Sequence, residues 1–89
     1  PSVNLITAMN SRKSSAIIIN AANEIFVDEF LKNNINFNAI ISNLKLVLKD
    51  KDYIKTSNLT ANSLKKIYMI DRWARASAQK IILRKKTNV

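Results

Sequence analysis

Apolar residues recur at helical spacing along most of the chain, and this pattern predicts four helices. A residue every three or four positions gives a helix one apolar face, whereas strands alternate every two residues. The helices are predicted at about 2–11, 16–33, 39–51 and 61–85. We therefore expect an all-α fold, a small four-helix bundle in which residues 1–89 form a single domain.

The second predicted helix, 16–33, is apolar on almost every side. Such a helix is usually central and packed on several faces. Ser14 or Ser15 is a suitable N-cap, because a serine hydroxyl can accept a hydrogen bond from an unpaired N–H of the first turn. Asn33 and Asn34 are expected to end the helix, since asparagine tolerates the left-handed conformation common there and the chain has no glycine.

The third predicted helix, 39–51, has a single apolar stripe. Asn38 is its expected N-cap, and Phe37 is expected to pack on Ile41 as a hydrophobic staple. The apolar stripe consists of Ile40, Ile41, Leu44, Val47 and Leu48.

The last predicted helix follows the one long loop-like stretch of the chain. We expect that loop at 51–58, with Tyr53 and Ile54 attaching it to the core. Thr60 is the expected N-cap of the helix. The residues expected to be buried along its main face are Leu64, Ile67, Ile70, Ala74, Ala78, Ile81 and Ile82.

The amino-acid composition excludes several kinds of chemistry. The chain contains no Cys, no His and no Gly. Disulfides and thiolate metal sites need Cys, and His is the commonest general base and metal ligand. Phosphate-binding loops of the usual kind need Gly. We therefore expect no catalytic, cofactor-binding or metal-binding residue in this chain.

The net charge of +9 leaves two interpretations open. A basic protein can bind nucleic acid, so a free-standing basic helical nucleic-acid-binding protein is the alternative function. The other interpretation is the codon usage of an AT-rich genome, because the chain is rich in Ile, Lys and Asn and only four of its fifteen cations are Arg. We favour the second, since the basic clusters lack interleaved surface aromatics.

Nothing in the sequence predicts a membrane partner or secretion. The longest uninterrupted apolar run is Ala16–Ile19, whereas a membrane-spanning helix needs roughly 20 apolar residues. A basic N-terminus followed by a long apolar core, which would indicate a signal peptide, is not seen.

Asp71 is a charged residue within the apolar stripe of the last predicted helix. Burying an unpaired carboxylate is costly, and Arg75 stands four residues later, the right spacing for an ion pair on a helix. We predict a half-buried pair that fixes helix packing. A catalytic role is disfavoured, because no His, Cys or second buried carboxylate accompanies the pair.

Asn20, Asn23 and Glu24 form a polar group on the otherwise apolar second helix. We expect these side chains to bond a loop or a neighbouring domain, as buried polar side chains usually do. The alternative is a ligand or metal site, for which one carboxylate and two amides are few strong ligands.

Met69 and Trp73 lie opposite the main stripe of the last predicted helix. An exposed aromatic patch usually marks an interface, so we predict that these residues contact another surface. The alternative is a Trp ring covered by the stems of Lys or Arg side chains.

Several separated motifs together resemble the C-terminal domain of the 1-deoxy-D-xylulose 5-phosphate reductoisomerase family. They agree with that family in order and in spacing over nearly the whole chain. The motifs are Pro1–Leu5, Asn20–Glu24 (Asn-Ala-Ala-Asn-Glu), the pair Phe30-Leu31, Ile35 with Phe37, and Ile70–Ala78.

The resemblance implies a larger enzyme of which this chain is the C-terminal helical domain. Family members are oxidoreductases that use NADPH and Mg²⁺ or Mn²⁺ to convert 1-deoxy-D-xylulose 5-phosphate into 2-C-methyl-D-erythritol 4-phosphate, in non-mevalonate isoprenoid synthesis. The implied partners are the NADPH-binding and catalytic domains of the same chain, in a homodimer located in the bacterial cytoplasm or an organelle. None of the family's catalytic motifs matches a position here, so the domain is expected to be a non-catalytic support.

Overall fold

The computed structural model describes residues 13–87, which form four helices and no strand. The all-α class predicted from the sequence is therefore confirmed. The predicted helix at 2–11 lies outside the described residues. The observed helices are α2 (Ser15–Leu31), α3 (Phe37–Leu48), α4 (Tyr53–Ser57) and α5 (Leu64–Thr87).

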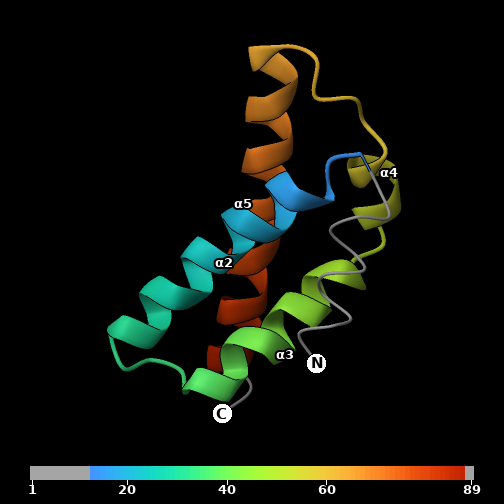
Figure 1. Ribbon diagram of the computed structural model, residues 1–89. Helices are drawn as coiled ribbons and strands as arrows, with labels where there is room; N and C mark the ends of the chain where they lie inside the picture. Colours follow the sequence, from blue (N-terminus) through green and yellow to red (C-terminus); the bar gives the residue numbers. More distant parts are fainter. Residues whose placement is uncertain (1–12, 88–89) are drawn as a thin grey trace.

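Two helices joined by a short turn pack against a third, longer one. α2 and α3 run in opposite directions, and α5 lies behind both (Figure 1). The core between them combines large residues from each helix, such as Phe26, Leu44 and Ile70, with the small residues Ala74 and Ala78 of α5. Burying each large apolar side chain contributes about 1.5–3 kcal/mol, so these contacts hold the helices together.

Ser14 occupies the N-cap position of α2, one of the two positions predicted for it, but its hydroxyl does not cap the helix. That hydroxyl donates instead to the carbonyl oxygen of Leu59 at 2.5 Å, and its backbone N–H donates to the carbonyl oxygen of Ser57 at 2.8 Å. The hydroxyl groups of Ser15 and Tyr53 lie 2.9 Å apart in the interior. The start of α2 is thereby attached to α4 and to the segment that follows it.

The end of α2 uses asparagine as predicted. Asn33 has a positive φ of 62°. The N–H groups of Asn33 and Asn34 donate to the carbonyl oxygens of Phe30 and Glu29, both at 2.9 Å, which is the Schellman arrangement. Because the chain has no glycine, asparagine takes the left-handed position.

The predicted start of α3 was wrong by two residues. The N-cap is Asn36, whose Oδ1 accepts a hydrogen bond from the N–H of Ala39 at 2.9 Å, and not Asn38. Phe37 therefore lies inside the helix and not before its cap, where a hydrophobic staple would need it. Its exposed ring meets that of Phe30 edge to face, with ring centroids 5.8 Å apart.

The segment predicted as a loop at 51–58 contains the short helix α4. Tyr53 is buried as expected, whereas Ile54 is exposed, so only Tyr53 attaches this segment to the core. The carboxylate of Asp50 fixes the preceding turn, because its Oδ1 accepts from the N–H of Asp52 at 2.9 Å. Five residues are too few for apolar periodicity to reveal a helix.

α5 begins later than predicted, and its first two apolar stripe residues are not buried. Ser63 replaces the predicted cap Thr60, since its hydroxyl accepts from the N–H of Lys66 at 3.2 Å. The stripe is buried from Ile70 onwards, but Leu64 and Ile67 are exposed. The reason is that the first turns of α5 extend past the start of α2 (Figure 1).

Candidate interdomain surface

A three-residue ion network joins α2 to α5. The Nη2 of Arg75 donates to Oε2 of Glu24 at 2.6 Å, and its Nε donates to Oδ2 of Asp71 at 2.8 Å. The pair predicted from the spacing of Asp71 and Arg75 is present, and both side chains are about one third exposed. The sequence did not predict Glu24 as the third member, because its partner lies 51 residues away.

The two carboxylates further favour the charged form of Arg75. The hydrogen bond to Asp71, and after it that to Glu24, raises the pKa of the Arg75 guanidinium above its ordinary value. A guanidinium presents several donors in one plane, so it can hold two carboxylates at once. The consequence is a fixed link between the exposed side of α2 and the middle of α5.

The structure separates Glu24 from the two asparagines with which it was grouped. Asn20 is exposed and Asn23 is half-buried. Within residues 13–87, neither amide has a hydrogen-bond partner. Their bonding to a loop or a neighbouring domain stays a prediction.

Trp73 and Met69 occupy different environments. Trp73 is half-buried and packs against the core, whereas half of the Met69 surface is exposed. Their role as a joint interface stays a prediction, and Met69 carries more of the exposed area.

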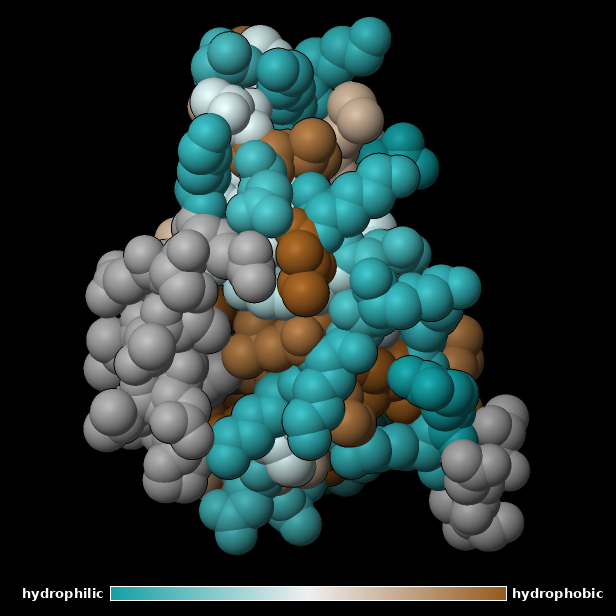
Figure 2. Space-filling view, turned by 90° about the vertical axis from the view of Figure 1, so that its right-hand side faces the viewer, coloured by the Kyte–Doolittle hydropathy of each residue, from teal (hydrophilic) through white to brown (hydrophobic). Residues whose placement is uncertain are grey.

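The first two turns of α5 expose apolar side chains on two sides of the helix, and these turns are here called the α5 overhang. Its exposed apolar residues are Leu64, Ile67, Tyr68 and Met69, exposed to 85%, 38%, 61% and 51%. The guanidinium of Arg72 lies 5.6 Å from the centre of the Tyr68 ring, within cation–π range. At the top of Figure 2, where these turns lie, hydrophobic surface appears between hydrophilic side chains. The sequence pattern placed Leu64 and Ile67 on the correct helix face but could not show how far that face is covered.

Two kinds of site are absent from the part of the chain that the structure describes. In residues 13–87, no group of three or more acidic side chains is placed to hold a metal ion. Among the helices α2 to α5, none is both long and apolar enough to cross a membrane.

Comparison with known proteins agrees with these features. The model of the protein family described as "DXP reductoisomerase C-terminal domain" matches residues 2–77. The chain belongs to the DXP reductoisomerase family. Within that family it is the C-terminal domain, and the matched region includes the motif Asn20–Glu24 and most of the motif Ile70–Ala78.

Three relatives named 1-deoxy-D-xylulose 5-phosphate reductoisomerase show how much of such an enzyme is present. The identity is 42% over 76 residues for Wolbachia sp. subsp. Brugia malayi, 38% over 73 for Wolbachia pipientis subsp. Culex pipiens, and 36% over 76 for Prosthecochloris aestuarii. The matches cover 82–85% of this chain but only 18–19% of the relatives. The matched part of the chain therefore spans less than a fifth of these reductoisomerases. No solved structure matches the chain.

Proposed function

We propose that this C-terminal domain is a non-catalytic support, and that it docks through the α5 overhang onto the rest of a DXP reductoisomerase. The observation that carries the proposal is the exposure of the apolar side chains of the α5 overhang. Four large apolar side chains are exposed at one end of a helix. Leu64 shares one side of that helix with Ile67 and Tyr68, three and four residues later, and Met69 lies on the opposite side from Ile67. Exposed apolar surface such as that of Leu64, Ile67 and Tyr68 usually marks an interaction site.

The positive charge around the α5 overhang indicates what kind of surface on the rest of the enzyme would fit it. Lys65 and Lys66 lie in the first turn of α5, and no acidic residue accompanies them there. The first turn of a helix also carries a partial positive charge. An apolar patch bordered by acidic side chains would complement this arrangement.

The link from Arg75 to Glu24 and Asp71 supports a rigid role. It lies along α5 one to two turns after Met69, so it fixes the part of the helix next to the overhang against α2. A domain held in this way can present the overhang at a constant angle. Support of this kind positions groups elsewhere in an enzyme without touching the substrate.

In this proposal, NADPH and Mg²⁺ or Mn²⁺ bind to other domains of the same polypeptide. The residues of this chain do not fit either group. The chain has no glycine for a dinucleotide-binding loop, and residues 13–87 contain no acidic cluster for a metal ion. The full enzyme would convert 1-deoxy-D-xylulose 5-phosphate into 2-C-methyl-D-erythritol 4-phosphate as a homodimer, in the bacterial cytoplasm or an organelle.

A chimeric enzyme tests the docking proposal. This chain would replace the matching segment of the Wolbachia sp. relative, with and without the double substitution I67K/M69K. We expect the unmodified chimera to be active, and the double variant to lose kcat/KM and several degrees of Tm. The same substitutions should change the Tm of the isolated 89-residue chain by less than about 3 °C, because both side chains are already exposed.

The matched control is L31K/I54K, which places two lysines on exposed apolar residues outside the overhang. Equal losses in both double variants would contradict docking through the overhang, and so would an inactive unmodified chimera. In a separate assay, the isolated chain should not turn over substrate with NADPH and Mg²⁺, and measurable turnover would refute the non-catalytic role.

A further inference from the structure

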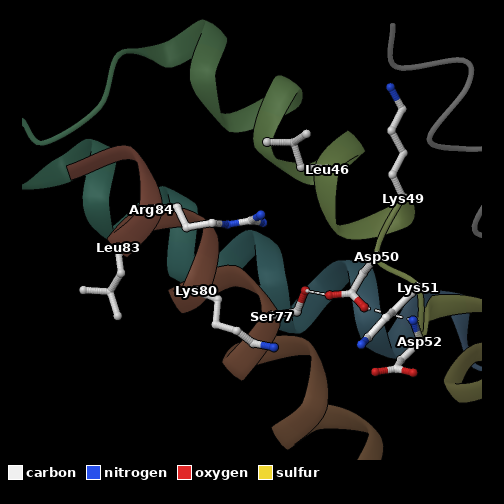
Figure 3. A pocket seen from close by; sticks show the side chains of 9 residues that line it. All are labelled: Leu46, Lys49, Asp50, Lys51, Asp52, Ser77, Lys80, Leu83 and Arg84. Carbon is white, nitrogen blue, oxygen red and sulfur yellow. Dashed lines mark hydrogen bonds between the residues drawn. The ribbon is translucent and has the colours of Figure 1, made fainter. Parts of the chain in front are cut away.

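A groove of about 660 Å³ lies on the surface between the end of α3, the turn before α4, and the second half of α5 (Figure 3). Six of the nine residues that line it are charged, although the stems of those side chains and two leucines also give it apolar surface. Its charged side chains are Lys49, Lys51, Lys80, Arg84, Asp50 and Asp52. There are four basic side chains against two acidic ones, and without Lys49, which points away from the groove, the excess is one positive charge.

Of the two acidic residues in the groove, Asp50 has its carboxylate bonded within the fold. Oδ2 of Asp50 accepts a hydrogen bond from the hydroxyl of Ser77 at 3.2 Å, and its Oδ1 accepts from the N–H of Asp52 at 2.9 Å. Ser77 is buried on α5, so Asp50 fastens the turn to that helix. One wall of the groove is therefore held in place, and Asp50 is directed towards the protein.

The lysines of the groove are not neutralised within the described chain. Among residues 13–87, no carboxylate lies within ion-pair distance of Lys49, Lys51 or Lys80. In Figure 3 the side chains of Lys51, Lys80 and Arg84 extend towards the space between the turn and α5, whereas Lys49 points away. Cationic heads from two separate segments thus face a common space.

We propose that this groove binds an oxyanion of the phosphate class, held by Lys51, Lys80 and Arg84. Lysine and arginine are the usual ligands of phosphate groups in proteins. The groove has more basic than acidic side chains, and a concave site with an excess of positive charge attracts anions. The proposal concerns a different face from the α5 overhang and does not depend on docking there. The phosphate could belong to a small compound or to a nucleic-acid backbone.

Titration of the 89-residue chain with inorganic pyrophosphate, followed by NMR at constant ionic strength, tests the site. We expect saturable binding with the shifts centred on Lys51 and Lys80. K51Q/K80Q should weaken binding about tenfold, because each exposed charge contact contributes up to roughly 1 kcal/mol. The control K65Q/K66Q removes the same charge from the first turn of α5 and should change binding less than about twofold.

The substitution Asp52→Asn tests the site through an expected gain in pyrophosphate binding instead of a loss. The Asp52 side chain is exposed and forms no cap hydrogen bond with α4, so the fold does not require it. Removing its charge should tighten pyrophosphate binding about threefold. A variant that failed to fold could not produce a gain of this kind.

A parallel titration with short duplex DNA distinguishes the sources of the phosphate. DNA binding that K51Q/K80Q weakens much more than K65Q/K66Q would support the groove with nucleic acid as its ligand. Pyrophosphate binding with this selectivity, and no DNA binding, would support a small phosphate compound. Equal weakening by the two double variants, or no saturable binding of either probe at physiological salt, would overturn the proposal.

Discussion

Arg75 on α5 donates a hydrogen bond to Glu24 on α2 at 2.6 Å, across 51 residues of sequence. The same guanidinium also bonds Asp71, four residues before it on α5. One side chain thus satisfies a half-buried carboxylate of its own helix and links that helix to another. Removing Arg75 would break both contacts, whereas removing Glu24 would break one.

Substitution of Arg75 by Met should therefore lower the free energy of unfolding by about 1–2 kcal/mol, because Asp71 loses its partner in a partly buried position. Glu24→Gln should cost less than about 1 kcal/mol, since Glu24 is largely exposed. Urea denaturation of both variants and of the double variant measures the coupling between the two residues. Additive effects would show that the link between α2 and α5 contributes nothing.

Replacing Asn33 by glycine should stabilise the domain, and replacing it by alanine should destabilise it. Its φ of 62° lies in the left-handed region, which costs residues with a β-carbon about 1 kcal/mol and costs glycine almost nothing. Asn33→Gly should raise the free energy of unfolding by about 0.5 kcal/mol, and Asn33→Ala should lower it by about 1 kcal/mol. The neighbouring substitution Asn34→Ala serves as a control for loss of an amide alone. Thermal melts that rank alanine above glycine at position 33 would contradict this account.

Local sequence signals predicted α2, α3 and α5 but not their limits, and they missed α4. The spacing of Ile70, Ala74 and Ile81 identified the buried face of α5 correctly. The same spacing included Leu64, which is exposed, because periodicity marks a face and not the length over which a partner covers it. Likewise, Asn36 and Asn38 are equally good N-caps by residue type, and the path of the preceding turn chooses between them.

The residues of the candidate sites that could not be predicted from the sequence are those brought together from distant segments of the chain. The pair of Asp71 with Arg75 follows from a spacing of four residues on one helix. No spacing rule brings Glu24 to Arg75, or Lys51 to the same groove as Lys80. Those neighbours arise only after α2 and α3 have packed on α5, so they require the fold.

Ala74 should not tolerate a larger side chain. It is completely buried on the face of α5 that packs against the other helices. Ala74→Leu should lower the free energy of unfolding by about 1–3 kcal/mol, because a close-packed interior has no room for the added carbons. Ala76→Leu makes the same change on the exposed side of α5 and should be nearly neutral. Similar urea midpoints for the two variants would show that the packing around Ala74 is loose.

Asn43 carries a polar group that the interior does not satisfy. Its side chain is completely buried in α3, and its Oδ1 accepts a hydrogen bond from Nζ of Lys85 on α5 at 2.5 Å. Within the described residues 13–87, its Nδ2 has no hydrogen-bond partner. A buried donor without an acceptor costs about 1–3 kcal/mol, which an apolar side chain of similar size would not incur.

Asn43→Leu should therefore raise the free energy of unfolding by about 1 kcal/mol, or Tm by about 5 °C, since the exposed Lys85 can return to water. Lys85→Met should have the opposite effect, because it leaves Oδ1 of Asn43 unsatisfied as well. Once Leu stands at position 43, adding Lys85→Met should change little, since the acceptor is already gone. Calorimetric melts of the two single variants and the double variant check all three expectations. A lower Tm for Asn43→Leu would mean that the amide is better satisfied in solution than its contacts indicate, and that its bond to Lys85 stabilises the contact between α3 and α5.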